Sequence, residues 1–221
     1  MTRVQRHDNQ PMVEPDSLPG RLRLSASGLL CRRGGRVVFS GVNFSLLSGE
    51  ALAVTGRNGS GKSSLLRMIA GLLNIAGGRL ALEGGEPERS IGEQAHYLAH
   101  HDPLKPSLSV IENLRFWIDY LGSRGAPETA LAALGLETLA DFPAAYLSAG
   151  QRRRLSLARL AAIARPVWLL DEPAAGLDAP AQITLDRLMR DHLAGGGIIV
   201  AATHAPLAFD LAQELRLGAA S

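Results

Sequence analysis

Residues 56–64 read GRNGSGKSS, a loop in which three glycines lead to a lysine and two serines. The segment matches G-x-x-x-x-G-K-[ST], a pattern in which glycines let backbone N–H groups converge on phosphate oxygens. We expect Lys62 to contact the β- and γ-phosphates of a nucleotide and the Ser63 hydroxyl to bind Mg²⁺. The candidate phosphate-binding residues are Gly56, Arg57, Asn58, Gly59, Ser60, Gly61, Lys62, Ser63 and Ser64.

An acidic pair ends a second apolar run, VWLLDEP at 167–173. Asp171 stands where a carboxylate can hold Mg²⁺. Glu172 stands where a general base can polarise an attacking water. An acidic pair at a strand end is also typical of a plain turn, here closed by Pro173. The catalytic interpretation therefore depends on the phosphate loop found elsewhere in the chain.

A third candidate, His204, follows the apolar run GIIVAAT at 197–203. A histidine in this place can contact a γ-phosphate or orient the water that Glu172 activates. Because a single histidine at a strand end is more often structural, His204 is a catalytic candidate only in combination with the other motifs.

The segment LSAGQRRR at 147–154 indicates a second place for a phosphate, because a serine and a glycine open a helix there. We interpret the run Arg152–Arg154 as a solvated helix face. Nucleic acid is not an expected partner, since no aromatic residues interleave with these arginines and the net charge is only +2.

These motifs need strands and helices to hold them. ALAVT at 51–55 is a short continuous apolar run, typical of a parallel strand buried on both faces, and the runs at 167–170 and 197–203 are similar. Residues 21–50 and 79–84 indicate short strands between turn residues. A helix is expected from about 62 to 72, with an apolar face made of Leu65, Leu66, Ile69, Leu72 and Leu73.

From about 102 to 165 the pattern is helical. Ser109 and Glu112 form the S-x-x-E signature of a capping box, and Pro127 suits the first turn of a second helix. A third helix begins at LSAGQ, and Arg165 before Pro166 is expected to end it. The predicted fold class is α/β: a parallel-sheet core interrupted by a helical insertion at about 102–165, with a small β region at the front.

The composition fits a globular chain, because 46% of its 221 residues are hydrophobic. Cys31 is the single cysteine, which excludes an internal disulfide and suits a reducing compartment. Residues 1–20 are polar and proline-containing, so we expect a disordered tail rather than a signal peptide. No run reaches the ~18 apolar residues of a membrane span. We therefore expect a cytoplasmic chain that would need another chain to supply any spans.

In type and order, these motifs resemble the ATP-binding-cassette (ABC) family of ATPases over residues 21–217. The similar pieces are the phosphate loop, the signature LSAGQ, the run that ends at Asp171 and Glu172, the D-loop AGLD at 175–178 and His204. The resemblance implies a P-loop NTPase whose ABC nucleotide-binding domain spans 21–217. That domain has a RecA-like parallel-sheet core, an N-terminal antiparallel β region and an inserted helical subdomain at about 102–165. It also implies ATP and Mg²⁺ as cofactors.

The same resemblance implies a head-to-tail homodimer, which would explain why one chain has two places for a phosphate. In that family, the signature of one chain completes the γ-phosphate site on the phosphate loop of the other. The residues so implied are Ser148, Gly150, Gln151 and Asp178. A second helix N-terminus directed at the same triphosphate adds electrostatic stabilisation that exists only in the closed dimer.

The sequence departs from the family pattern at three places. The signature has Ala149 at a position where glycine is the commonest residue in the family. Alanine costs little there unless the φ of Ala149 is positive. No aromatic residue stands before the first hairpin to stack on adenine, so we expect Arg32 or Arg33 to take that role. His100 stands where the family has a glutamine near Mg²⁺, which makes His100 an implied metal ligand. Two alternatives stay open: the neighbouring His101 takes this role, or the histidine is a solvated loop residue.

The segments 29–50, 97–117, 147–160 and 196–207 resemble one branch of the family more closely, the ATP-binding subunit of the haem exporter in bacterial cytochrome c maturation. This branch implies a peripheral ATP hydrolase at the cytoplasmic face of the inner membrane, bound to an integral membrane subunit. The alternatives are an ABC ATPase for another cargo, a soluble cassette ATPase acting on DNA or ribosomes, and a regulator without turnover, against which Glu172 argues.

Overall fold

The computed structural model describes residues 21–99, 103–204 and 212–218. The expected tail at 1–20 and the expected metal ligand His100 lie outside these residues. The helices are α1 (Lys62–Ile69), α2 (Val110–Tyr120), α3 (Pro127–Ala133), α4 (Ala149–Ala162) and α5 (Ala179–Ala194). The strands are β1 (Arg23–Arg33), β2 (Arg36–Leu47), β3 (Ala51–Thr55), β4 (Gly77–Glu83), β5 (Ala95–Leu98), β6 (Val167–Asp171), β7 (Ile198–Ala202) and β8 (Ala212–Arg216).

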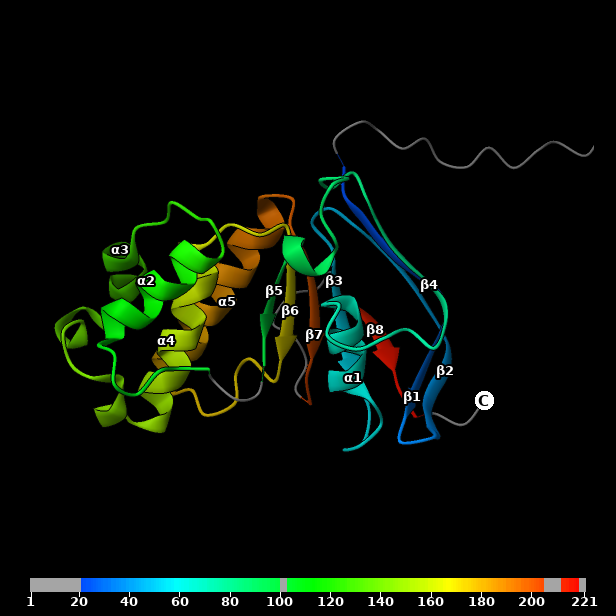
Figure 1. Cartoon of the computed structure of the whole chain (residues 1–221), viewed down its shortest axis with the longest axis horizontal. Coiled ribbons are helices and arrows are strands. Elements are labelled where there is room, and N and C mark those ends of the chain that lie inside the picture. Colours follow the sequence, from blue (N-terminus) through cyan, green and yellow to red (C-terminus); the bar gives the residue numbers. More distant parts are fainter. Residues whose placement is uncertain (1–20, 100–102, 205–211, 219–221) are drawn as a thin grey trace, which may run out of the picture.

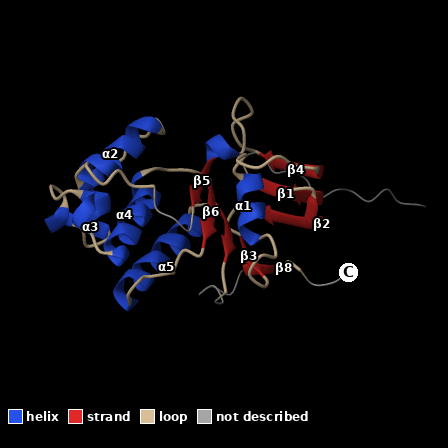
Figure 2. Ribbon diagram, turned by 60° about the horizontal axis from the view of Figure 1, so that its bottom comes forward, coloured by secondary structure: helices blue, strands red, loops and turns tan. Residues whose placement is uncertain are grey.

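The elements form layers around a five-stranded sheet. Helices α2 to α5 lie on one side of this sheet, and α1 lies between its other side and a three-stranded sheet (Figure 1; Figure 2). The larger sheet is parallel in the order β5-β6-β7-β3-β8, and the smaller one is antiparallel in the order β2-β1-β4. This arrangement confirms the predicted α/β fold class. No helix among the described residues is long and apolar enough to cross a bilayer.

The parallel sheet separates two apolar cores. Successive residues of a pleated strand point to opposite faces. Accordingly Trp168 and Leu170 of β6 pack with α2 to α5, whereas Val167 and Leu169 pack with α1 and the antiparallel sheet. Both faces are covered, which explains why β7 is apolar throughout and why β3 and β6 are apolar up to their last residues, Thr55 and Asp171. Strands β5 and β8 and helix α5 were not predicted.

The antiparallel region consists of long strands with bulges, whereas the sequence suggested several short strands. The pairing of β1 with β2 shifts register between Ala26 and Leu29. Gly28 lies in this shift with a φ of 61°, and its N–H donates to Asn43 Oδ1 at 2.8 Å. The glycine and asparagine that suggested strand ends therefore form a bulge inside a continuous ladder.

Helix α1 packs both sheets together but is shorter than predicted. Leu65, Leu66 and Ile69 are buried as expected. Gly71, with a φ of 71°, ends the helix, so Leu72 leaves its apolar face and is 66% exposed. On the side of the antiparallel sheet, Cys31 is fully buried, and Ser64 of α1 lies near its thiol.

Helices α2 and α3 begin at the residues that the sequence indicates as helix starts. Ser109 and Glu112 form the predicted capping box of α2. Pro127 is the first residue of α3, also as predicted. Helix α4 ends at Ala162, before the predicted end at Arg165. Arg165 instead donates from Nη2 to the carbonyl oxygen of Leu121 at 2.8 Å. This hydrogen bond connects the segment before β6 to the end of α2.

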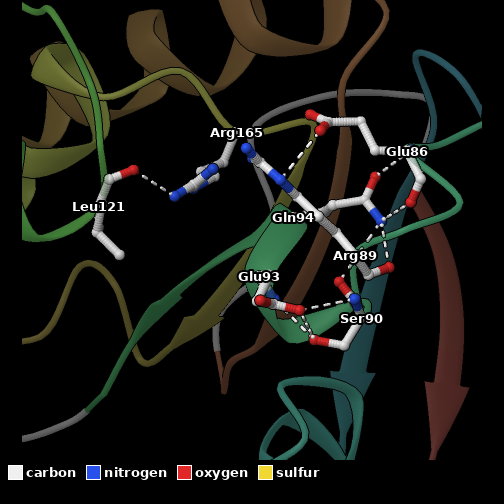
Figure 3. Close-up of polar contacts among 7 residues, drawn as sticks. All are labelled: Glu86, Arg89, Ser90, Glu93, Gln94, Leu121 and Arg165. Carbon is white, nitrogen blue, oxygen red and sulfur yellow. Dashed lines mark hydrogen bonds and ion pairs between the residues drawn. The ribbon is translucent and has the colours of Figure 1, made fainter.

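The loop from β4 to β5 is held by one buried amide. Gln94 accepts at Oε1 from the backbone N–H of Glu86 at 2.6 Å, and its Nε2 donates to the carbonyl oxygens of Glu86 and Arg89 at 3.0 Å (Figure 3). Glu93 accepts from the N–H and hydroxyl of Ser90 in the same loop (Figure 3). These bonds fix the start of β5, the strand that ends just before His100.

Candidate functional site

Three loops leave the parallel sheet at the same edge. Val54 of β3 and Asp171 of β6 both lie opposite Ala202 of β7. The loops that follow these strands therefore emerge side by side, at the carboxyl edge where open α/β sheets bind ligands. They hold the phosphate loop, Glu172 and His204, so the fold brings these predicted residues together.

The phosphate loop needs glycine where no side chain fits. Gly56 has a φ of 137°, and a Cβ there would collide with the carbonyl oxygen of Leu217. Gly61 has a φ of 103°, and a Cβ there would lie 2.7 Å from Val38 Cγ1 and 2.8 Å from Phe39 Cδ1. Gly61 precedes α1 without a side-chain cap, so the N–H groups of the first turn are available to an anion.

Lys62, His204 and Glu172 meet at one point. Lys62 is 8% exposed, and its Nζ donates to the carbonyl oxygen of Gly56 at 2.9 Å and lies 3.3 Å from Nε2 of His204. The same Nε2 lies 3.4 Å from Oε1 of Glu172. That oxygen is buried and has no hydrogen-bond partner among the described residues. A cation, an imidazole and a carboxylate thus share one wall of a cavity.

The cavity has a volume of about 890 Å³. From the phosphate loop and α1 it is lined by Asn58, Gly59, Gly61, Lys62, Ser63, Ser64 and Arg67. Gly56, Arg57 and Ser60 do not line it, although Gly56 holds Lys62 through its carbonyl oxygen. Arg67 donates from Nε to the Tyr97 hydroxyl at 3.3 Å, which raises the pKa of its guanidinium and fixes a positive charge on this wall.

Asp171 and Ser63 line this cavity together. Asp171 is 4% exposed, and the described residues contain no group of three or more His, Cys, Asp or Glu side chains that could cage a metal ion. One carboxylate and one hydroxyl suit Mg²⁺, which keeps several waters and takes its remaining ligands from phosphates. The residues therefore fit Mg²⁺ that arrives with a nucleotide.

The first hairpin contributes Arg33 and Val38 to the cavity. Arg32 does not line it, because neighbouring side chains of a strand point to opposite faces. The nearby aromatic residue Phe39 is 7% exposed and lies against Gly61. Of the two arginines that the sequence left open, Arg33 is therefore the one that lines the cavity.

The signature residues do not line this cavity. Ser148 caps α4, because its Oγ accepts from the N–H of Gln151 at 3.2 Å and its N–H donates to Gln151 Oε1 at 2.8 Å. Gly150 lies beside Gly176, and Asp178 caps α5 by accepting from Ala181 N at 3.1 Å. Among the described residues Glu172 alone combines a side chain with positive φ, so Ala149 is unstrained.

The arginine run is not a uniformly solvated face, and that expectation is wrong for Arg153. Its side chain is buried, and its Nη2 donates to the carbonyl oxygens of Glu172 at 2.8 Å and Asp171 at 3.2 Å. A signal was present in the sequence: Arg153 shares a helix face with Leu157 and Leu160, one and two turns further on. Both leucines are buried.

The sequence of the chain matches a known protein family. Residues 39–175 match the family described as ABC transporter, which is more than half of the chain. The chain belongs to the ABC transporter family. Since ATP is the nucleotide of this family, the chain binds ATP and is an ATPase.

Relatives with similar sequences carry one description. The chain is 60% identical over 201 residues to the "Cytochrome c biogenesis ATP-binding export protein CcmA" of Nitrobacter winogradskyi, covering 90% of this chain and 100% of the relative. Proteins of the same description from Rhodopseudomonas palustris and Bradyrhizobium diazoefficiens are 59% and 58% identical, covering 90% and 89% of this chain and 100% and 98% of the relatives.

Solved structures agree with the ABC fold. One, described as the ATP-binding subunit of an ABC transporter, has a TM-score of 0.77 at 24% identity and covers 89% of this chain and 88% of its own. Another, a putative ABC transporter ATP-binding protein from Pyrococcus furiosus, has a TM-score of 0.74 at 21% identity, covering 87% of this chain and 97% of its own.

Proposed function

We propose that this ABC ATPase powers an export step of cytochrome c biogenesis through a separate membrane subunit, with haem as the exported cargo. The observation that carries the proposal is the 60% identity to a cytochrome c biogenesis export protein over that protein's whole length. The meeting of Lys62, Glu172 and His204 in one cavity supports ATP hydrolysis as the energy source.

In the proposed reaction the triphosphate lies on the phosphate loop, and Lys62 contacts its β- and γ-phosphates. Water attacks the γ-phosphorus while Glu172 accepts a proton from that water. The bond from the γ-phosphorus to the bridging oxygen breaks, leaving ADP and inorganic phosphate. The proton on Glu172 then passes to the products or solvent, which restores the base. We propose that His204, whose Nε2 lies 3.4 Å from Oε1 of Glu172, orients the water or contacts the γ-phosphate.

Ser63 and Asp171 are the described residues that would hold Mg²⁺. When bound, the ion neutralises charge on the phosphates. His100 is proposed as a further ligand from its sequence position alone. The carboxylate of Asp171 is buried next to the phosphate loop, where a cation would offset its charge.

We also propose a head-to-tail dimer in which Ser148, Gly150, Gln151 and Asp178 act on the partner's nucleotide. None of these four residues lines the cavity that contains Lys62. The exposed N-terminus of α4, opened by Ser148, would instead direct its N–H groups at a phosphate of the facing chain. Closure would then require ATP, and hydrolysis would release it.

The proposed location is the cytoplasmic face of a bacterial inner membrane, where the chain is a peripheral protein held by the membrane subunit. The domain boundaries proposed from the sequence are 21–217 for the ATP-binding domain and about 102–165 for its helical subdomain. Helices α2, α3 and α4 fall within the latter range.

The proposal can be tested in Rhodopseudomonas palustris lacking its own relative of this chain. Tagged wild-type protein should restore covalently bound haem in c-type cytochromes, and Glu172→Gln should not. Detergent-solubilised membranes should release the tagged chain together with an integral membrane protein, which mass spectrometry identifies.

Each outcome separates the alternatives. Recovery of the chain with a membrane subunit, but with no restoration of c-type cytochromes, would indicate an ABC ATPase for another cargo. Recovery only in the soluble fraction, with DNA or ribosomes, would indicate a cassette ATPase outside transport and would overturn the proposal.

A further inference from the structure

Arg153 lies in the second turn of α4, and its side chain is 4% exposed. Its guanidinium faces the loop that follows β6. Nη2 donates to the carbonyl oxygens of Glu172 at 2.8 Å and Asp171 at 3.2 Å, and Nε lies 3.4 Å from the carbonyl oxygen of Pro173. One planar guanidinium therefore binds the carbonyl oxygens of three consecutive residues, 171–173, which include the proposed base. Arginine suits this arrangement because its N–H donors have fixed relative directions.

The same guanidinium reaches a second loop. Its Nη1 donates to the carbonyl oxygen of Ala99 at 2.8 Å. Ala99 follows β5 and immediately precedes His100, the proposed metal ligand. Arg153 thus joins the helix that begins at Ser148 to the loops after β5 and β6. A lysine, with one compact ammonium group, could not make these bonds together.

The segment that Arg153 binds has an uncommon backbone conformation. Glu172 has a φ of 48°, the left-handed region that non-glycine residues adopt at a cost of about 1 kcal/mol. Two bonds hold it there: its N–H donates to Ala202 at 2.9 Å, and its carbonyl oxygen accepts from Arg153. In this conformation Oε1 lies 3.4 Å from Nε2 of His204. Such strain persists only where neighbouring groups fix it.

We infer that Arg153 is a positioning residue: it holds the backbone of Glu172 in the left-handed conformation and so aims the carboxylate at the attacking water. Because Arg153 lies five residues after Ser148 on the same helix, it also links two half-sites within one chain. Movement of the α4 N-terminus on the partner's nucleotide is transmitted to the base that serves the chain's own nucleotide. This inference rests on the proposed ATPase mechanism.

The test compares three variants of the full chain. Arg153→Lys keeps the positive charge and loses the planar set of guanidinium N–H donors. Arg153→Met keeps only the apolar part of the side chain. Arg154→Met is the matched control, because Arg154 is on the same helix and also donates to a backbone carbonyl, that of Leu134 at 3.3 Å, away from Glu172. For each variant, steady-state kcat and KM, equilibrium ATP binding and the thermal midpoint are measured.

We expect Arg153→Lys to lower kcat by roughly 10- to 100-fold, the size of a misplaced catalytic group, with KM and ATP affinity nearly unchanged. Arg154→Met should keep wild-type kcat. The decisive measurement is a double-mutant cycle with Glu172→Gln: once the base is absent, replacing Arg153 should cause no further loss. A residue that only stabilises the fold would lower kcat by the same factor in both backgrounds.

The failures are distinguishable. Wild-type protein without ATPase activity would overturn the proposed function and this inference with it. Active wild type in which Arg153→Lys and Glu172→Gln act additively, or in which Arg153→Lys raises KM alone, would overturn only the inference. If Arg153→Met does not fold, Arg153→Lys decides the question, and loss of folding in both would assign Arg153 a structural role instead.

Discussion

The ammonium of Lys62 lies 3.3 Å from Nε2 of His204, and this contact determines what the imidazole can do. Lysine ammonium is only a donor, so the tautomer that allows this hydrogen bond has Nε2 as acceptor and the ring proton on Nδ1. Nε2 then has no proton to donate to Oε1 of Glu172, 3.4 Å away. The buried Oε1 consequently keeps its lone pairs for a proton from water, as a general base requires.

Replacing Glu172 by glutamine should lower kcat by ~10²-fold or more, because the amide keeps the shape and cannot accept the proton. ATP affinity should be retained and ATP-bound dimers should accumulate, which gel filtration with ATP and Mg²⁺ would detect. Glu128→Gln is a suitable control, since Glu128 is an exposed residue paired with Arg115 at 2.7 Å. Turnover at the wild-type rate in Glu172→Gln would contradict the role of this base.

Two equivalent capping boxes allow the dimer proposal to be tested against stability. Ser148 and Ser109 each cap a helix through the same pair of bonds. Ser148→Ala and Ser109→Ala should each cost about 1 kcal/mol in the free energy of unfolding, measured by urea titration. Only Ser148→Ala should reduce turnover, and Ser148→Arg should abolish it by blocking closure.

ATP binding by the monomer distinguishes the role of the signature from that of the phosphate loop. Ser148→Arg should bind ATP as wild type does, whereas Lys62→Ala should lose ATP binding, because Lys62 lines the cavity and Ser148 does not. Fluorescent ATP at a protein concentration that keeps the chain monomeric gives both affinities. Equally poor binding by the two variants would place the signature in the same site as the phosphate loop.

Arg33 should contribute to recognition of the base. Stacking of a guanidinium on an aromatic ring is worth about 1 kcal/mol, so Arg33→Ala should weaken ATP binding roughly five-fold. Arg32→Ala is the control, since Arg32 lies outside the cavity. Binding of inorganic tripolyphosphate should be unaffected by Arg33→Ala. A similar loss for ATP and tripolyphosphate would mean that Arg33 contacts phosphate.

His96 should make the protein less stable in mild acid. Burial lowers its pKa from 6.5 to about 3, and the charges of Arg159 and Arg165 act in the same direction. Below pH 6.5 the unfolded chain binds a proton that the folded chain excludes, so the free energy of unfolding falls as pH drops. From about pH 7 to about pH 5 the loss is about 2 kcal/mol.

His96→Gln keeps an amide donor for the carbonyl oxygen of Ile163, which His96 Nε2 contacts at 3.0 Å. Urea titrations of this variant at the two pH values should show a shallower pH dependence than wild type. His192 has the same sign, because burial lowers its pKa to about 4, so His192→Gln should flatten the dependence as well. If the free energy of unfolding of both variants depends on pH as steeply as that of wild type, the result would contradict the prediction that these buried imidazoles are neutral in the folded chain.

The elements with strong local signals could be predicted from the sequence. The run 51–55 is β3 to the residue, and Ser109 with Glu112 caps α2. Strand β8 has the polar sequence AQELR and is a strand only because β3 lies beside it. Such pairing is non-local, so composition within the segment could not reveal it.

The candidate site was likewise predictable from the sequence only in part. Motif spacing identified Lys62, Glu172 and His204, but their meeting depends on the strand order β6-β7-β3, which no spacing encodes. Arg153 stands in a charged run, and only its spacing to Leu157 and Leu160 indicates that it is the buried arginine of that run. What its guanidinium binds depends on the loops after β5 and β6, and those loops meet the helix only in the folded chain.

The single thiol of the chain gives this ATPase a built-in reporter. Cys31 is fully buried in β1 beside Ser64 of α1, and burial raises its pKa, so reactive thiolate is scarce in the closed fold. A thiol reagent reaches this sulfur only when the antiparallel sheet separates from α1. The labelling rate therefore measures the opening free energy of the layer that supports the phosphate loop, with no engineered probe.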